Sequence, residues 1–218
     1  MIRRGMVASV LFNVDSRQRS GSVCGSVFLI SPARCDGRRA ALLTNPASAF
    51  PLAVRLRSDS GVPIGEAFAF LSGLYFRGKL TYAQAFGAAQ VITTDRGLVS
   101  PEARITREDL SAFAEVDIAT AGERHAGPLR RDAIRISDSL PAHTPVVLLG
   151  SIATGKYADT LAEVFGEQLV FPKEFVGRGD MSRGGLLLRC AREGRELEYA
   201  PVIGAVRRGV RPPKLPKL

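Results

Sequence analysis

The sequence predicts a single α/β domain with a mainly parallel sheet and helices on both faces of that sheet. Short apolar segments typical of buried strands alternate along the chain with amphipathic segments of helical period. Strands and helices that alternate in this way form a sheet whose strands are mainly parallel. With 218 residues, 45% of them hydrophobic, the chain is long enough for one domain with a complete core.

The amino-terminal part, residues 1–38, differs in composition from the rest of the chain, because several arginines lie among serines and glycines. Residues 7–12 and 27–30 are apolar enough to form the two strands of a hairpin, and the segment is equally compatible with a poorly ordered extension or with translation from an upstream start. We therefore expect the α/β domain at residues 39–206, followed by a basic, proline-rich tail at 207–218.

The first elements of this domain are expected to be short. Residues 41–44 form an apolar run that ends at an Asn-Pro turn signal, and residues 52–57 alternate apolar and basic side chains as half-exposed strands do. Residues 67–86 have helical period, with interruptions near Gly73 and Gly78.

The strand at 145–149 is the clearest element, because it is apolar throughout and therefore typical of a central strand covered on both faces. Thr106 is in position to cap the helix that follows it. The other expected elements are strands at 90–94, 169–171 and 201–206 and helices at 108–114, 127–139, 158–165 and 182–192.

The charge of the chain favours anionic partners. There are 30 basic and 21 acidic side chains, which gives a net charge of +9 and an isoelectric point of about 10.1. Nucleotides, nucleic acid and acidic membrane surfaces are attracted to such a balance. No segment approaches the roughly 18 consecutive apolar residues of a membrane-spanning helix. We therefore expect that this protein does not span a membrane.

The cysteines and histidines suggest neither a disulfide framework nor a metal site. Cys24, Cys35 and Cys190 are odd in number and widely spaced, so we expect reduced thiols in a cytoplasmic protein. His125 and His143 lack metal-ligand spacing to each other or to a cysteine, and we expect both on the surface. We expect no metal and no other cofactor, and the oligomeric state is left open.

Parallel α/β sheets bind ligands beyond the carboxyl ends of their strands, which selects the turns after residues 94, 149 and 176. The turn after 149 leads into a helix, and backbone N–H groups at the start of a helix bind phosphate. Its spacing matches the G-x-x-x-x-G-K phosphate loop, but Tyr157 stands where a serine or threonine would hold magnesium. The expected ligand-binding residues are Gly150, Ser151, Thr154, Gly155 and Lys156.

The second candidate loop, 177–185, contains four glycines, two arginines and an aspartate. Such a composition costs much conformational entropy unless the loop has a binding role. Asp180 and Ser182 are the candidate catalytic residues, with Asp180 as an acid–base group, although either side chain can equally cap the next helix. The expected ligand-binding residues are Gly177, Arg178, Gly179 and Arg183.

A third group combines aromatic and basic side chains. Tyr75 can stack on a base while Arg77 and Lys79 contact phosphates, whereas Phe76 is expected in the core. The turn after the predicted strand at 90–94 is expected beyond the carboxyl ends of the strands, as are the turns after 149 and 176. The candidate ligand-binding residues of this group are Tyr75, Arg77, Lys79, Asp95 and Arg96.

Three short motifs lie within residues 72–105: Leu-Tyr at 74–75, Lys-Leu-Thr-Tyr-Ala at 79–83 and Gly-Leu-Val-Ser-Pro at 97–101. In this order, on either side of a predicted strand, they resemble bacterial proteins of the YaaA-like type. The resemblance implies an α/β fold similar to that of uracil-DNA glycosylases and a nucleobase or nucleic-acid ligand near Tyr75 and the turn after the strand. It implies no catalytic residue.

Taken together, these features predict an α/β protein that binds a nucleotide or nucleic acid. If it is an enzyme, we expect metal-independent hydrolysis or transfer on a nucleobase- or phosphate-containing substrate. The alternatives are a non-enzymatic module that binds DNA or RNA through its charge, and a subunit whose glycine-rich loops contact a partner protein. A binder of the polyelectrolyte type loses affinity steeply as salt rises, which separates it from a protein with a small-ligand pocket.

Overall fold

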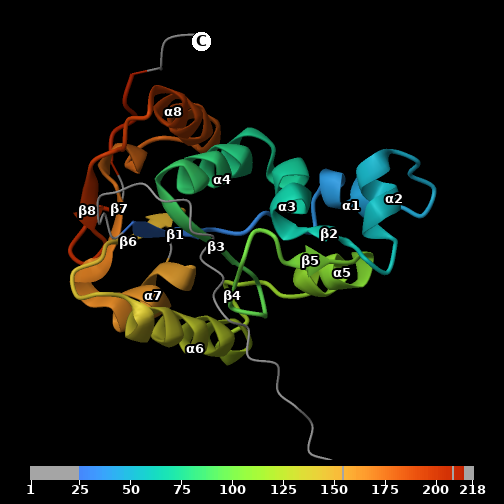
Figure 1. Ribbon diagram of the computed structural model, residues 1–218, viewed down its shortest axis with the longest axis horizontal. Coiled ribbons are helices and arrows are strands. Elements are labelled where there is room, and N and C mark those ends of the chain that lie inside the picture. Colours follow the sequence, from blue (N-terminus) through green and yellow to red (C-terminus); the bar gives the residue numbers. More distant parts are fainter. Residues whose placement is uncertain (1–24, 154, 208, 214–218) are drawn as a thin grey trace, which may run out of the picture.

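The fold is organised around a six-stranded sheet with the strand order β4-β3-β1-β6-β7-β8 (Figure 1). The computed structural model describes residues 25–153, 155–207 and 209–213. The four inner strands run parallel, and each edge strand is antiparallel to its neighbour. The strands of this sheet are β1 (Ser26–Ile30), β3 (Gly87–Ile92), β4 (Leu98–Val99), β6 (Val146–Leu149), β7 (Leu169–Pro172) and β8 (Tyr199–Pro201). The predicted α/β fold with a mainly parallel sheet is confirmed.

Helices cover both faces of the sheet (Figure 1). On one face lie α4 (Leu74–Phe86) and α8 (Asp180–Glu193), and on the other lie α6 (Glu123–Ser139) and α7 (Lys156–Phe165). A smaller group of elements extends beyond the β4 edge. It contains α1 (Arg38–Thr44), α2 (Pro51–Leu56), α3 (Ile64–Ser72), α5 (Arg107–Ala114) and the two-stranded sheet of β2 (Val62–Pro63) and β5 (Arg104–Ile105).

The position of β1 corrects the expected amino-terminal boundary. Residues 27–30 were assigned to an extension at 1–38, yet β1 is an inner strand that pairs in parallel with β3 and with β6. Phe28, Leu29 and Ile30 are completely buried, as an inner strand covered on both faces requires. A hairpin through 27–30 is therefore wrong, because both partners of β1 are parallel and distant in sequence. Its other expected strand, 7–12, lies outside the described residues.

The segment expected as a half-exposed strand is a helix, and the apolar run before it is helical too. Residues 41–44 belong to α1, and residues 52–57 lie largely in α2. Pro51 stands at the first position of α2, where its fixed φ and missing N–H suit a helix start. The buried residues of α2 are Ala53 and Leu56, which lie three positions apart on one helical face. Over six residues, the alternation of apolar and basic side chains does not distinguish a strand from a helix.

The segment at 67–86 is divided as the glycines suggested, but only at one of them. Gly73 has φ +60 and separates α3 from α4, whereas Gly78 lies inside a continuous α4. The strand at 145–149 and the helices near 108–114, 127–139, 158–165 and 182–192 are confirmed, with α6 beginning earlier at Glu123. The last strand, β8, ends at Pro201, which is where the expected strand at 201–206 was to begin.

Thr106 begins α5 with a capping box, as expected. Its Oγ1 accepts a hydrogen bond from the Asp109 N–H at 3.4 Å, and the Thr106 N–H donates to the Asp109 carboxylate at 2.8 Å. We expect Thr106→Ala to lower the free energy of unfolding by about 1 kcal/mol, because the first turn of the helix loses its side-chain acceptor. Urea unfolding would measure the loss, and Thr106→Ser, which keeps the hydroxyl, should restore most of it. Equal losses in both variants would contradict the role of the hydroxyl.

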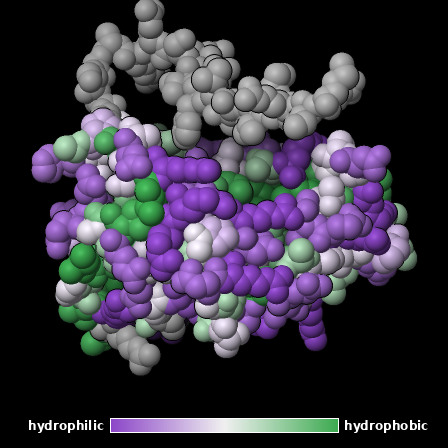
Figure 2. All heavy atoms as spheres, turned by 90° about the horizontal axis from the view of Figure 1, so that it is seen from below, coloured by the Kyte–Doolittle hydropathy of each residue, from purple (hydrophilic) through white to green (hydrophobic). Residues whose placement is uncertain are grey.

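One face of the domain is mostly polar (Figure 2). Figure 2 shows a face that is largely hydrophilic, with hydrophobic residues in scattered patches rather than one continuous area. No helix among the described residues combines the length and the apolar character needed to cross a membrane. Many basic side chains are ion-paired, and these include Arg55 with Glu66 and Arg96 with Asp109.

Candidate functional site

The candidate site lies where the connections of the sheet change direction. From β1 the chain crosses over to β3 on one side, and from β6 it crosses over to β7 on the other. β1 and β6 are neighbours, so their carboxyl ends form the topological switch point at which open α/β sheets bind ligands. Ser31 follows β1 and Gly150 follows β6, and the Ser31 N–H donates to the Leu149 carbonyl at 3.1 Å.

A buried lysine contacts the end of β1. Lys79, on α4, donates hydrogen bonds from Nζ to the Ser31 backbone oxygen and to Ser31 Oγ, both at 2.7 Å. The Nζ atom also lies 4.4 Å from the centre of the Tyr75 ring. Only 1% of Lys79 is exposed, and none of the ion pairs between described residues includes it. A buried lysine without a carboxylate partner is uncommon and marks a functional candidate.

Burial controls the protonation of this lysine. Loss of hydration lowers the pKa of Lys79 to about 7, with Asp180 opposing the shift and Arg183 adding to it. Near neutral pH the amine and the ammonium are therefore both populated. In the neutral form Nζ can accept a proton, and in the charged form it attracts an anion.

Tyr157 and Gly150 complete the end of β6. The Tyr157 hydroxyl accepts a hydrogen bond from the Ser151 N–H at 3.1 Å. A Cβ at Gly150 would stand 2.8 Å from Tyr157 Oη and 2.9 Å from Ser31 Cβ, so only glycine lets the two side chains approach here. Burial raises the pKa of Tyr157, while hydrogen bonding with Ser31 and Ser151 works against the rise.

Arg183 and Tyr75 approach the same place from α8 and α4. Arg183, whose side chain is 13% exposed, donates to the Phe175 carbonyl at 2.9 and 3.1 Å and lies 5.2 Å from the centre of the Phe175 ring. Tyr75 Oη is buried and has no hydrogen-bond partner among the described residues. Burial raises the pKa of Tyr75, and the nearby Arg183 holds it down in part. We call these residues the switch-point cluster: Ser31, Tyr75, Lys79, Gly150, Ser151, Tyr157 and Arg183.

Known proteins offer no relative from which the role of this cluster could be transferred. The chain matches no model of a protein family, no curated protein and no solved structure. The switch-point cluster must therefore be interpreted from its own chemistry. Among the described residues, no group of three or more histidine, cysteine, aspartate or glutamate side chains is placed to hold a metal ion.

Five of the sequence-predicted residues meet in this cluster, but their environment differs from the prediction. Tyr75 and Lys79 were expected on an exposed stacking platform, yet both are buried, because α4 turns this face toward β1 and α8. Phe76 is in the core as predicted. The five residues are Gly150, Ser151, Tyr75, Lys79 and Arg183.

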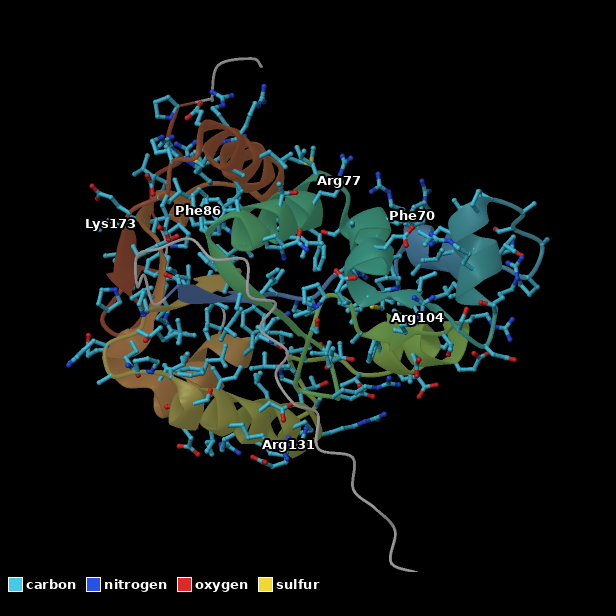
Figure 3. The ribbon with its side chains drawn as sticks, viewed as in Figure 1. Phe70, Arg77, Phe86, Arg104, Arg131 and Lys173 are labelled. Carbon is cyan, nitrogen blue, oxygen red and sulfur yellow. The ribbon has the colours of Figure 1, made fainter. Side chains whose placement is uncertain are left out.

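Other predicted residues lie outside the cluster. Gly155 caps α7 and Lys156 is its exposed first residue, while Thr154 is not among the described residues. Arg77 is exposed, and Figure 3 shows it on the outer side of α4. Arg96 lies in the turn after β3, where it pairs with a carboxylate of α5. Its guanidinium carbon is 4.9 Å from the centre of the Phe113 ring.

The loop at 177–185 is largely engaged with the carboxyl-terminal segment. Gly177 has φ +73, and a Cβ there would stand 2.1 Å from the Val210 carbonyl oxygen. Arg178 donates to Ser182 Oγ at 3.3 Å and to the Pro213 carbonyl at 3.4 Å. Gly179 precedes α8 as its cap.

The expected catalytic pair therefore has a different setting. Asp180 is 69% exposed in the first turn of α8 and lies 3.7 Å from the Arg183 guanidinium. Ser182 accepts its hydrogen bond from Arg178. Among the described residues, no hydrogen bond joins the Ser182 hydroxyl to a base that would activate it.

Near the end of β3, His125 and one carboxylate oxygen of Asp95 are buried. His125, expected on the surface, is 3% exposed because the start of α6 packs its ring on the end of β3, where Nδ1 lies 2.9 Å from the Thr94 carbonyl oxygen. His143 is exposed as predicted. One carboxylate oxygen of Asp95 is buried without a hydrogen-bond partner among the described residues.

Sequence reasoning did not find Ser31, and it interpreted Tyr157 only as a departure from a phosphate-loop motif. Ser31 follows the apolar run at 27–30 directly and precedes Pro32, which is a usable signal for the carboxyl end of a strand. This signal does not identify Ser31 by itself, because the composition of residues 1–38 places the run outside the expected domain. The pairing of Ser31 with Lys79, 48 residues later, has no local signature.

Proposed function

We propose that the switch-point cluster binds a small phosphate-bearing ligand of the nucleotide class. The observation that carries the proposal is Lys79, a buried lysine at the switch point that has no carboxylate partner within the described part of the chain. Buried charges in proteins are paired, or they are neutralised by a shifted pKa. An anionic ligand would supply a counter-charge to the ammonium form, and the neutral form would still be able to accept a proton.

The surroundings of Lys79 support an anion at this place. Arg183 offers a guanidinium on a side chain that is only 13% exposed, and Tyr75 Oη offers a buried donor that no described residue uses. The helices α7 and α8 both begin at this edge, and the amino ends of helices attract negative charge. The resemblance of residues 72–105 to YaaA-like proteins adds support for a nucleobase in the ligand.

A thermal-shift screen with nucleotides, nucleosides and sugar phosphates tests the proposal. We expect one class to stabilise the protein by roughly 2.7 kcal/mol at about 100 times its dissociation constant. Arg183→Met should abolish the shift, because the guanidinium of the cluster is lost. Arg192→Met is the matched control, since Arg192 is an exposed residue at the far end of the same helix, and it should keep the full shift.

The same screen includes short single- and double-stranded oligonucleotides at several salt concentrations. Binding of oligonucleotides alone, with a steep loss at high salt and no effect of Arg183→Met, would contradict the proposal and favour binding through charge. Deletion of 207–218 should then reduce the salt dependence. In the folded chain Arg207 pairs with Asp159 at 2.7 Å, so this arginine is not free of the domain.

A further inference from the structure

We propose that Ser31 is a catalytic nucleophile and Lys79 its general base, in the hydrolysis of a carboxylic ester whose other part carries an anionic group. The structure places Ser31 Oγ 2.7 Å from Lys79 Nζ at the carboxyl end of the inner strand β1. The inference shares one premise with the proposed function, which is that the ligand binds at the switch-point cluster.

The position of Ser31 suits a nucleophile. Its hydroxyl lies between the amine of Lys79 and the hydroxyl of Tyr157, and the glycine at 150 allows that approach. The second bond of Lys79, to the Ser31 backbone oxygen, fixes the amine relative to the residue that it would activate. Ser31 is 6% exposed, so a small part of its surface is open.

The position of Lys79 suits a base. A serine hydroxyl is a weak nucleophile unless an adjacent base takes its proton, and serine–lysine pairs perform this role in several unrelated enzymes. The groups that face Lys79 are the rings of Tyr75 and Phe76 on its own helix and, from α8, Asp180 and Arg183. None of them is a carboxylate within ion-pair distance, so the amine can be neutral near pH 7.

The reaction balances with water as the co-reactant. The Ser31 proton passes to the neutral Lys79 amine as Oγ forms a bond to the ester carbonyl carbon. The ester C–O bond then breaks, and the leaving alcohol takes the proton from the Lys79 ammonium. Water next adds to the acyl-Ser31 ester by the same route, which releases the carboxylic acid and restores Ser31 and Lys79. Arg183 and the amino ends of α7 and α8 would hold the anionic part of the substrate.

A small dialkyl fluorophosphate tests the nucleophile on the full chain without any substrate. Attack by Ser31 Oγ forms an O–P bond and releases fluoride, and peptide mass spectrometry locates the adduct. We expect one adduct, on Ser31, with a labelling rate that rises through a single ionisation near pH 7. Lys79→Met should slow labelling by at least about 100-fold, as loss of a general base does. Ser111→Ala, on the exposed face of α5, should label like the wild type.

The outcomes separate the serine–lysine pair from nucleotide binding. The absence of an adduct on the folded wild-type protein, or an adduct on Ser182 instead, would overturn the pair whatever nucleotides bind. An adduct on Ser31 without any nucleotide-induced stabilisation would retain the pair and reject the nucleotide class. Circular dichroism and urea midpoints of Ser31→Ala and Lys79→Met establish that a lost signal comes from chemistry and not from unfolding.

Discussion

Gly184→Ala is expected to lower the free energy of unfolding by about 3 kcal/mol, whereas Gly185→Ala, one residue later, should leave it unchanged or raise it by up to about 1 kcal/mol. A Cβ at residue 184 would stand 2.7 Å from the Leu74 carbonyl oxygen and 2.8 Å from Tyr75 Cα, both backbone atoms of α4. A Cβ at residue 185 would meet nothing within 4 Å. The two substitutions therefore add the same methyl group to the same helix in opposite environments.

The close crossing of α4 and α8 is the reason for the large effect. Gly78 faces Gly184 from the other helix, and a Cβ there would stand 2.6 Å from the Gly184 carbonyl oxygen. Backbone atoms cannot move aside as a flexible side chain can, so the helices must separate. Lys79 and Arg183 are carried by these two helices, and Gly184→Ala should therefore also weaken binding of any ligand of the cluster.

Urea unfolding of the wild type and both variants measures this difference. Gly185→Ala controls for the general effect of replacing a helical glycine by alanine, which favours the helix. Equal free energies of unfolding for the two variants would show that α4 and α8 do not cross at backbone contact.

The second large effect concerns pH. The free energy of unfolding of the wild type is expected to rise by about 1 to 2 kcal/mol between about pH 7 and pH 8.5, and this rise should be absent in Lys79→Met. Burial holds the pKa of folded Lys79 at about 7, against 10.5 for an exposed lysine. Between these values the unfolded chain binds a proton that the folded protein does not, so raising the pH favours the folded state.

Other groups limit the useful range of pH. Burial raises the pKa of Cys35 to about 12 from 9.0, so its contribution to stability falls as pH rises above about 9. His125, whose pKa is lowered by burial, contributes mainly below pH 7. Measurements should therefore end near pH 8.5. The variant Lys79→Met lacks the amine of residue 79 and keeps the other titrating groups, so its difference from the wild type gives the contribution of the lysine. A slope that persists in Lys79→Met would contradict the buried, partly neutral amine.

Much of the fold could be predicted from local patterns. The strand at 145–149, the capping of α5 by Thr106 and the break at Gly73 are confirmed, and each rests on signals within a few residues. The candidate turn after 149 was identified for the same reason, since an apolar strand followed by a glycine and a helix specifies the carboxyl edge of a sheet. The helix α2 was mistaken for a strand because its six residues are too few for the helical period to be distinguished.

The sequence by itself therefore determined the fold class, most of the elements after residue 60, and the edge of the sheet at which Gly150 and Ser151 lie. Only the tertiary structure decided that residues 26–30 form an inner strand, because both parallel partners of β1 are distant in sequence. It also decided that Lys79 is buried against Ser31 rather than exposed. A helix position does not specify its neighbour, and here the glycine crossing of α4 and α8 brings the lysine and the arginine to one place.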